Sequence, residues 1–84
     1  MAVNMRNEFL HASRVHFEAR IEKHRVNVEN LLQNSAGIGE HGGLMDTIEK
    51  ELDEISKYHG LLEILDTYFP QDYDAKTTKE LING

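Results

Sequence analysis

Apolar residues recur at helical spacing, in steps of three, four and seven, through residues 3–34, and this spacing places side chains on one face of a helix. They are Leu10, Phe17, Ile21, Val28 and Leu31. The segment contains neither proline nor glycine and is rich in residues of high helix propensity. Because Arg14 and His24 interrupt the apolar stripe, the pattern predicts a long helix with an imperfect heptad seam rather than an ideal coiled coil.

Residues 35–43 separate this segment from the next one and hold four of the six glycines of the chain. Glycine adopts left-handed conformations easily and costs about 1 kcal/mol inside a helix. The segment therefore predicts the end of the first helix, a loop and the start of a second helix.

A second helix is predicted over residues 44–69, and Pro70 ends it because proline lacks the backbone N–H and disfavours a helical residue before it. One apolar stripe is assigned to the face toward the first helix. It consists of Met45, Ile48, Leu52, Ile55, His59 and Leu62. A second stripe widens the apolar face of the C-terminal half and consists of Leu61, Ile64, Leu65 and Tyr68. Gly60, inside this helix, indicates a kink or the close approach of another helix, unless it is simply tolerated.

Residues 71–84 form a short and mostly polar tail, in which positions 77–80 match a capping box. One short helix could form there, although a helix of this length needs docking to be stable. The chain has no internal repeat and no sustained alternation of apolar and polar residues, the pattern typical of strands. We therefore expect an all-α fold in one domain, with a helical hairpin over residues 1–70.

The second apolar stripe predicts self-association. A two-helix hairpin buries one stripe of each helix, and Leu61, Leu65 and Tyr68 cover too wide an arc to face the first helix together with the first stripe. A contiguous exposed apolar strip usually marks an interface, and a single core below about 80 residues contributes little net stability. These three residues are therefore expected to form the interface of a homodimer that is a four-helix bundle.

The charge of the chain is uneven. Residues 1–34 hold five basic and four acidic residues, whereas residues 44–84 hold four basic and ten acidic ones, and the whole chain of 84 residues has a formal net charge of −6. An acidic chain is a poor general binder of nucleic acid, because that binding requires a basic surface. A slightly basic helix beside an acidic one is attractive within a hairpin or across a dimer, but exposed ion pairs orient an assembly more than they drive it.

Further classes of function are excluded by composition. The chain has no cysteine, which excludes a disulfide scaffold, a thiolate zinc site and a cysteine nucleophile. Its longest apolar stretches are a few residues, far below the roughly 20 that a membrane-spanning helix needs. No serine-hydrolase nucleophile elbow occurs. We therefore expect a cytoplasmic protein without a membrane partner.

The spacing Gly37-x-Gly39-x-x-Gly42 matches the dinucleotide-binding fingerprint. That motif requires a strand before the glycines and a helix after them. A helix is predicted before them here, so we expect a plain loop. A weak anion site at the start of the second helix is the alternative, because free backbone N–H groups point there.

Glu8-x-x-His11 has the spacing that places a carboxylate and an imidazole on one helix face, as in di-iron helix bundles. In a hairpin the pair would lie opposite Glu63 and Asp66, which could complete a metal site. The arrangement is similar to that of encapsulated ferritins, which are also short two-helix chains. That family carries its Glu-x-x-His pair on the second helix, however, whereas this chain carries it on the first. We expect no bound metal and no cofactor.

Two pairs of acids, at positions 51 and 54 and at positions 63 and 66, faintly resemble the acidic pairs of all-helical nucleotide pyrophosphohydrolases of the MazG type. Those enzymes place the acids on different helices around magnesium, whereas here both pairs lie on one helix. A solvated acidic face is the expected role. His24 and His59 are both assigned to seam positions, where they could make assembly dependent on pH.

Four stretches of the chain carry one further resemblance: RNEFLH at 6–11, HFEARI at 16–21, IEKELD at 48–53 and LDTYFP at 65–70. Through them, residues 3–70 resemble small uncharacterised helical proteins of marine tailed phages, particularly cyanophages. The resemblance implies a phage protein that acts in the cytoplasm of the infected cell or in the virion. It implies no activity and no catalytic residue.

The sequence as a whole favours a non-enzymatic, self-associating helical interaction module. Its expected partner is a second copy of itself, and another protein is an additional candidate. The alternative is a metal-binding carboxylate and histidine bundle with ferritin-like oxidase or storage chemistry, in which the ligands would be Glu8, His11, Glu63 and Asp66.

Overall fold

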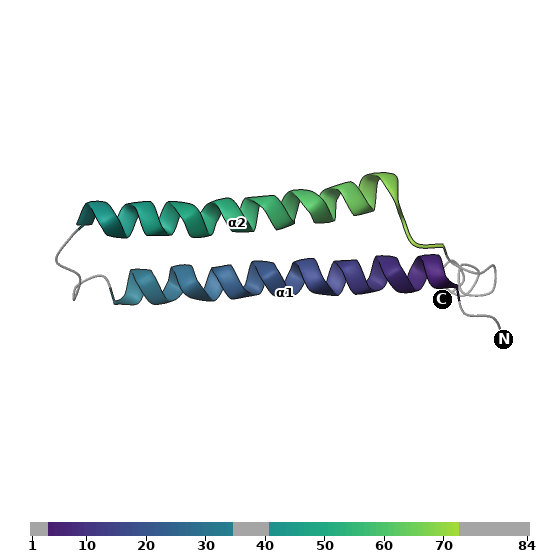
Figure 1. The fold of residues 1–84 in the computed structure, drawn as a ribbon, viewed down its shortest axis with the longest axis horizontal. Helices are drawn as coiled ribbons and strands as arrows, with labels where there is room; N and C mark the ends of the chain where they lie inside the picture. Colours follow the sequence, from purple (N-terminus) through teal and green to yellow (C-terminus); the bar gives the residue numbers. More distant parts are fainter. Residues whose placement is uncertain (1–3, 35–40, 73–84) are drawn as a thin grey trace, which may run out of the picture.

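The computed structural model describes residues 4–34 and 41–72, which form two helices packed side by side as an antiparallel hairpin (Figure 1). Helix α1 spans Met5–Gln33 and helix α2 spans His41–Tyr68. Because the described residues contain no strand, the predicted all-α hairpin is confirmed. The end of α1 and the start of α2 lie at one end of the hairpin, called the closed end below. The start of α1 and the end of α2 lie at the other, the open end (Figure 1).

Both helices begin and end within three residues of the predicted ranges 3–34 and 44–69. The largest difference is at the start of α2, which takes Gly43 into its first turn. There the hydroxyl of Thr47 donates a hydrogen bond of 2.8 Å to the carbonyl of Gly43. Residues 35–40 of the predicted loop and 73–84 of the predicted tail lie outside the described residues.

Local interactions set the ends of the helices. Asn4 has an extended backbone and caps α1, because its side-chain oxygen accepts a hydrogen bond of 3.1 Å from the backbone N–H of Asn7. Glu8 lies in the first turn, where a negative charge interacts favourably with the helix dipole. At the same end of the hairpin, α2 stops at Tyr68, two residues before Pro70, because proline cannot continue a helix.

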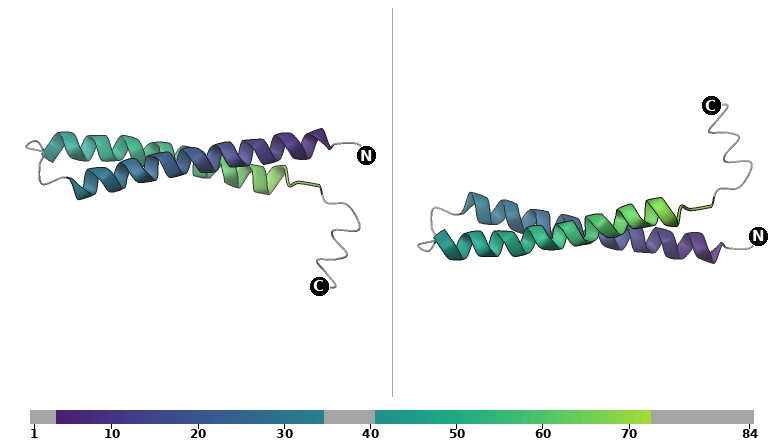
Figure 2. Two further views of the ribbon diagram at one scale, coloured as in Figure 1. Left: turned by 90° about the horizontal axis from the view of Figure 1, so that it is seen from below. Right: turned by 90° about the horizontal axis from the view of Figure 1, so that it is seen from above.

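The two helices pack along a single heptad seam and cross at a shallow angle (Figure 2). The seam residues of α1 are half-buried and follow alternating steps of three and four. They are Asn7, Leu10, Arg14, Phe17, Ile21, His24, Val28 and Leu31. This set contains the whole apolar stripe predicted for the first helix, together with the two residues predicted to interrupt it. The seam of α1 is therefore confirmed.

The seam of α2 is rotated from the predicted one. Its half-buried residues are Leu44, Ile48, Glu51, Ile55, Tyr58, Leu62 and Leu65. The prediction that Met45, Leu52 and His59 face α1 was wrong, because Met45 is 71% exposed, Leu52 is 51% exposed and the side chain of His59 is 67% exposed. In each case the residue one position earlier in the chain takes the place in the seam.

This rotation has a physical cause in the middle of the hairpin. It brings the ring of Tyr58 to 5.9 Å from the ring of Phe17 and stacks it on His24 at 6.5 Å, measured between ring centroids. It also brings Glu51 to His24. A face selected by hydrophobicity alone would prefer Leu52 to Glu51, but it would leave the imidazole of His24 in the seam without a carboxylate partner.

Glu51 is the centre of a polar network across the seam. The Nδ1 of His24 donates to the Oε2 of Glu51 over 2.6 Å, and the side-chain amide of Asn27 donates to the same oxygen over 3.0 Å. The carboxylate of Glu54 lies 4.0 Å from the other ring nitrogen of His24. Glu51 was predicted to lie on a solvated acidic face, and this was wrong, since its side chain is only 21% exposed.

The hydrogen bond from His24, followed by the one from Asn27, holds the pKa of the Glu51 carboxyl below its ordinary value. A carboxyl group whose pKa is lowered by folding stabilises the fold at pH values above its unfolded pKa, and this contribution is lost as the pH falls through the folded pKa. Ionised Glu51 therefore stabilises the hairpin at neutral pH.

The first prediction concerns this network. Glu51→Gln is expected to lower the thermal unfolding midpoint at pH 7, because it removes the ionised acceptor of two hydrogen bonds. The difference from the wild type is expected to shrink as the pH falls from about 4.3, the ordinary pKa of glutamate, through the lower pKa of the folded Glu51 carboxyl, because the wild-type side chain then becomes neutral as well. Circular dichroism melts at pH 7 and pH 3 measure both effects.

Glu49→Gln is the matched control for this prediction, because Glu49 is an exposed glutamate on the same helix. It is expected to change the midpoint much less at pH 7. Equal effects of the two substitutions at neutral pH would contradict the role assigned to Glu51.

Candidate functional site

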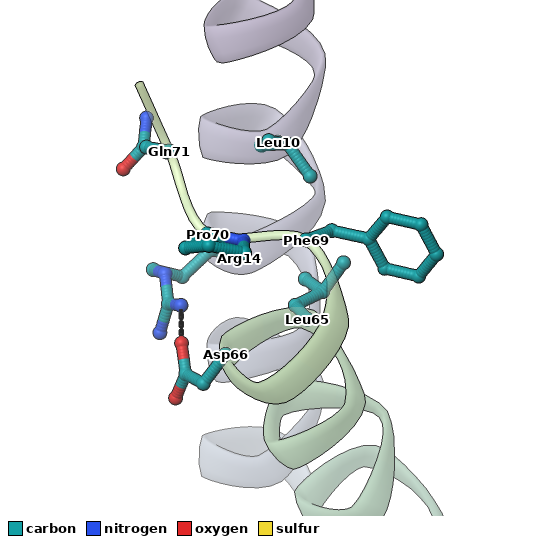
Figure 3. A pocket seen from close by; sticks show the side chains of 7 residues that line it. All are labelled: Leu10, Arg14, Leu65, Asp66, Phe69, Pro70 and Gln71. Atoms are coloured by element: carbon teal, nitrogen blue, oxygen red, sulfur yellow. Dashed lines mark hydrogen bonds and ion pairs between the residues drawn. The ribbon is translucent and has the colours of Figure 1, made fainter. Parts of the chain in front are cut away.

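The three residues predicted as a dimer interface lie at different depths in the hairpin. Tyr68 is 70% exposed, whereas Leu61 and Leu65 are half-buried. Leu65 belongs to the seam and lines a cavity together with Leu10 of α1 (Figure 3). Of the predicted set, Tyr68 is therefore the residue most available to another chain, and Leu65 already contributes to packing within the hairpin.

The cavity lies at the open end, where the chain leaves α2, and has a volume of about 230 Å³. It is lined by Leu10, Arg14, Leu65, Asp66, Phe69, Pro70 and Gln71. Arg14 and Asp66 form an ion pair on one side of it, and the ring of Phe69 points away on the other side (Figure 3). The guanidinium is thus paired with a carboxylate, and the cavity is lined by both polar and apolar side chains.

Arg14 occupies a seam position and yet keeps its charge at the surface. Its side chain is 34% exposed, and its guanidinium reaches Asp66 of α2. Long basic side chains can pack their aliphatic part against apolar residues while the charged head stays in water. This explains how a predicted interruption of the apolar stripe is accommodated without a break in the seam.

The segment after Pro70 is held against the first turn of α1. The side-chain amide of Asn7 donates to the carbonyl of Asp72 over 2.5 Å, and its oxygen accepts from the backbone N–H of Asp72 over 2.8 Å. Arg6 donates to the carbonyl of Pro70 over 2.9 Å and lies 3.2 Å from the carboxylate of Asp72. Gln71 donates to the carbonyl of Asn7 over 3.2 Å. The side-chain amide of Asn7 therefore binds both the N–H and the carbonyl of Asp72, as the backbone of a neighbouring strand would.

A second hollow, of about 370 Å³, lies on the outer surface of α2 near the open end. It is lined by Gly60, Glu63, Ile64, Thr67 and Tyr68. The first four of these follow the i, i+3, i+4, i+7 pattern of the residues that surround an inserted side chain in coiled coils. Gly60 creates the hollow, since a Cβ atom built there meets no other atom within 4 Å.

The four candidate metal ligands do not come together. Among residues 4–34 and 43–72, no group of three or more histidine, aspartate or glutamate side chains could hold a metal ion. Asp66 is paired with Arg14, and Glu63 lies 3.1 Å from His59 on its own helix. Glu8 and His11 are both exposed on α1. Within one chain, the described residues therefore do not bring these four side chains together.

The two histidines assigned to the seam have different surroundings. His24 lies in the seam as predicted, with 12% of its side chain exposed, and is held by Glu51. His59 lies outside the seam and forms a surface pair with Glu63. A surface pair of this kind contributes little to stability.

The sequence analysis did not identify two features of the open end, the pairing of Asn7 with Asp72 and the hollow at Gly60. The pairing of Asn7 with Asp72 joins residues at opposite ends of the hairpin, and no local pattern signals it. The hollow at Gly60 had a signal, because a glycine inside a helix indicates either a kink or a close approach. The second interpretation agrees with the open space beside it.

No family model matches the sequence, and neither the curated proteins nor the solved structures contain a significant match.

In the described part of the chain, neither helix combines the length and the apolar character needed to cross a membrane.

The second prediction concerns the attachment of the segment after Pro70. Asn7→Ala removes both hydrogen bonds to the backbone of Asp72, so the amide of Asp72 is expected to exchange with solvent about fivefold faster, as for the loss of about 1 kcal/mol. Hydrogen exchange followed by NMR measures this rate.

Gln33→Ala serves as the control for this prediction, because Gln33 is exposed at the closed end of α1. It is expected to leave the exchange of Asp72 unchanged. An unchanged rate in Asn7→Ala would show that the segment is held by Arg6 and Gln71 alone.

Proposed function

We propose that this chain is a non-enzymatic interaction module that works as a homodimer, in which two hairpins form a four-helix bundle. One observation carries this proposal: among the described residues whose side chains are placed, none is fully buried. The hairpin has a seam but no interior. A helical protein acquires an interior when further helices cover the seam, and a second copy supplies two of them.

The exposed apolar side chains support the same conclusion. Those of α1 are Met5, Phe9, Val15, Val26 and Leu32, and those of α2 and the residue after it are Met45, Leu52, Ile64, Tyr68 and Phe69. Single exposed apolar residues are ordinary on protein surfaces. Here, however, Tyr68 lines a hollow with Ile64 and makes a ring contact with Phe69, so three of them are contiguous. Contiguous apolar surface is typical of interaction sites.

The charged and histidine residues support a role other than catalysis. Among the described residues, three pairs of such groups lie apart from one another along the hairpin, namely His24 with Glu51, His59 with Glu63 and Arg14 with Asp66. Catalytic groups are instead expected to converge on one reactive position. We therefore propose a binding role without a metal or a cofactor.

The net charge bears on the partner proposed for this module, and the resemblance to phage proteins bears on its origin and compartment. The net charge of −6 favours a protein partner over nucleic acid. The resemblance to cyanophage proteins favours a phage origin, with action in the cytoplasm of the host cell or in the virion. No membrane partner is proposed.

The third prediction tests self-association. A chain of 9.7 kDa that dimerises is expected to give a mass of about 19 kDa by light scattering at micromolar concentration. Circular dichroism on the same sample is expected to show helix for about two thirds of the chain, because α1 has 29 residues and α2 has 28. A folded protein with the mass of a single chain would contradict the proposed function.

Leu65→Asp is not a clean test of the dimer, because Leu65 lies in the seam. A charge at this position would disrupt the hairpin itself. Substitutions that probe the interface must therefore be made at residues that the hairpin leaves exposed.

A further inference from the structure

Phe9 is the most exposed aromatic residue of α1, with 68% of its surface accessible. It lies near the open end, next in the chain to Leu10, which packs on the cavity at that end. An exposed phenylalanine gains little within the hairpin, whereas the burial of a large apolar side chain stabilises an interface strongly.

Phe9 lies on the same flank of the hairpin as Ile64 and Tyr68, which line one side of the hollow at Gly60. His16 follows Phe9 by seven residues, so the two share a side of α1, and the ring of His16 contacts that of Tyr58 in α2 at 6.4 Å. Lys57 covers the ring of Tyr58 at 4.8 Å, and Ile64 follows Lys57 by seven residues on the same side of α2. The flank that carries Phe9 on α1 thus carries Ile64 and Tyr68 on α2.

They also lie at the same level along the hairpin. Leu10 and Leu65 line one cavity, so the turn of α1 that carries Phe9 is beside the last turns of α2. The hollow is lined by residues 60–68 of those turns. Within one chain, however, Phe9 does not line the hollow, because the hollow is on the outer surface of α2.

We propose that two copies of this chain pack flank to flank with their open ends together, so that Phe9 of each copy enters the hollow beside Gly60 of the other. This inference rests on the proposed self-association and adds its surface and its orientation. A twofold axis along the hairpin keeps every residue at its own level, so both contacts form at once. In the opposed arrangement, the copies would lie side by side with the open end of one beside the closed end of the other. Phe9 would then lie beside the closed end of the partner, far from the hollow.

The charges of the helices favour the same arrangement and favour a second copy as the occupant. α1 holds five basic and four acidic residues, whereas α2 holds two basic and seven acidic ones. With open ends together, α1 of each copy lies beside α2 of the other, so unlike charges are neighbours across the interface. The opposed arrangement would place the acidic α2 beside its own copy, where like charges repel.

The area of one flank is sufficient for a stable dimer. A helix of 28 residues is about 42 Å long, and two helices side by side are about 20 Å wide. One flank thus offers about 800 Å² per copy, the amount that a standard specific interface buries on each partner.

The test uses substitutions that the hairpin itself tolerates. Gly60→Leu fills the hollow without a clash, because nothing lies within 4 Å of a Cβ at this position, and leucine favours helix over glycine. Phe9→Ala removes the side chain expected to enter the hollow. Met45→Ala is the matched control, since Met45 is exposed to the same degree as Phe9 but lies near the closed end.

We expect Gly60→Leu to reduce the mass measured by light scattering to that of one chain, under conditions where the wild type is a dimer, with no loss of helix content. Phe9→Ala is expected to weaken dimerisation at least about tenfold, as for an aromatic side chain that is buried in a pocket of its partner. Met45→Ala is expected to keep the wild-type dissociation constant.

The two failures are distinguishable. A wild-type protein with the mass of one chain would overturn both this inference and the proposed function. A wild-type dimer that survives Gly60→Leu and Phe9→Ala would overturn only this inference and place the interface on another surface. Weaker dimerisation in Met45→Ala alone would also overturn this inference and place the interface near Met45.

The orientation is measured by spin labels, which can be placed singly because the chain has no cysteine of its own. A label at Gln33→Cys, at the closed end of α1, is expected to lie within about 30 Å of its copy when the open ends are together. A label at Glu8→Cys, at the open end, is expected to give a similarly short distance. Separations of about 40 Å or more for both labels would show the opposed arrangement and overturn the inference.

Discussion

The hydrogen bonds that Glu51 accepts from His24 and Asn27 determine how α2 is rotated against α1. A rotation of one residue about the axis of α2 would exchange Glu51 for Leu52 and Tyr58 for His59 in the seam. It would place Leu52 in the position of Glu51, so His24 would lose its hydrogen bond to Glu51. A polar group left without its partner in a packed seam costs more than a hydrogen bond gains. The polar pair thus favours the observed packing over the one that the apolar pattern alone predicts.

The rotation of α2 determines which of its apolar residues remain on the outer surface of the hairpin. Since Leu62 and Leu65 turn toward α1, Ile64 and Tyr68 remain outside, and Gly60 leaves a hollow between them. The apolar residues of α2 exceed what one neighbouring helix can cover. The excess is therefore available to a partner, and its place at the open end follows from where the wide apolar arc lies in the sequence.

The fold was predictable because it depends on local signals. Glycines at residues 35–43 and Pro70 delimit two periodic segments, and these signals act within a few residues. The stripe of α1 was predictable too, including its interruptions. The stripe of α2 was not predictable in the same way. A hydrophobic scale places Leu52 in the seam in preference to Glu51, whereas in the structure Glu51 lies in the seam because His24 of α1 is opposite. The partner of Glu51 is 27 residues away in the chain, beyond the reach of any periodicity. The pairing of Asn7 with Asp72 escaped prediction for the same reason.

The central claim is that the hairpin completes its interior by binding a second copy of itself. The most direct measurement is the thermal unfolding midpoint as a function of protein concentration, because dimerisation stabilises the folded state by mass action. The account predicts that the midpoint rises by several degrees between about 1 µM and about 100 µM chain, with unchanged helix content below the transition. A midpoint that is the same over this range would show that a single hairpin unfolds on its own, and it would contradict the account.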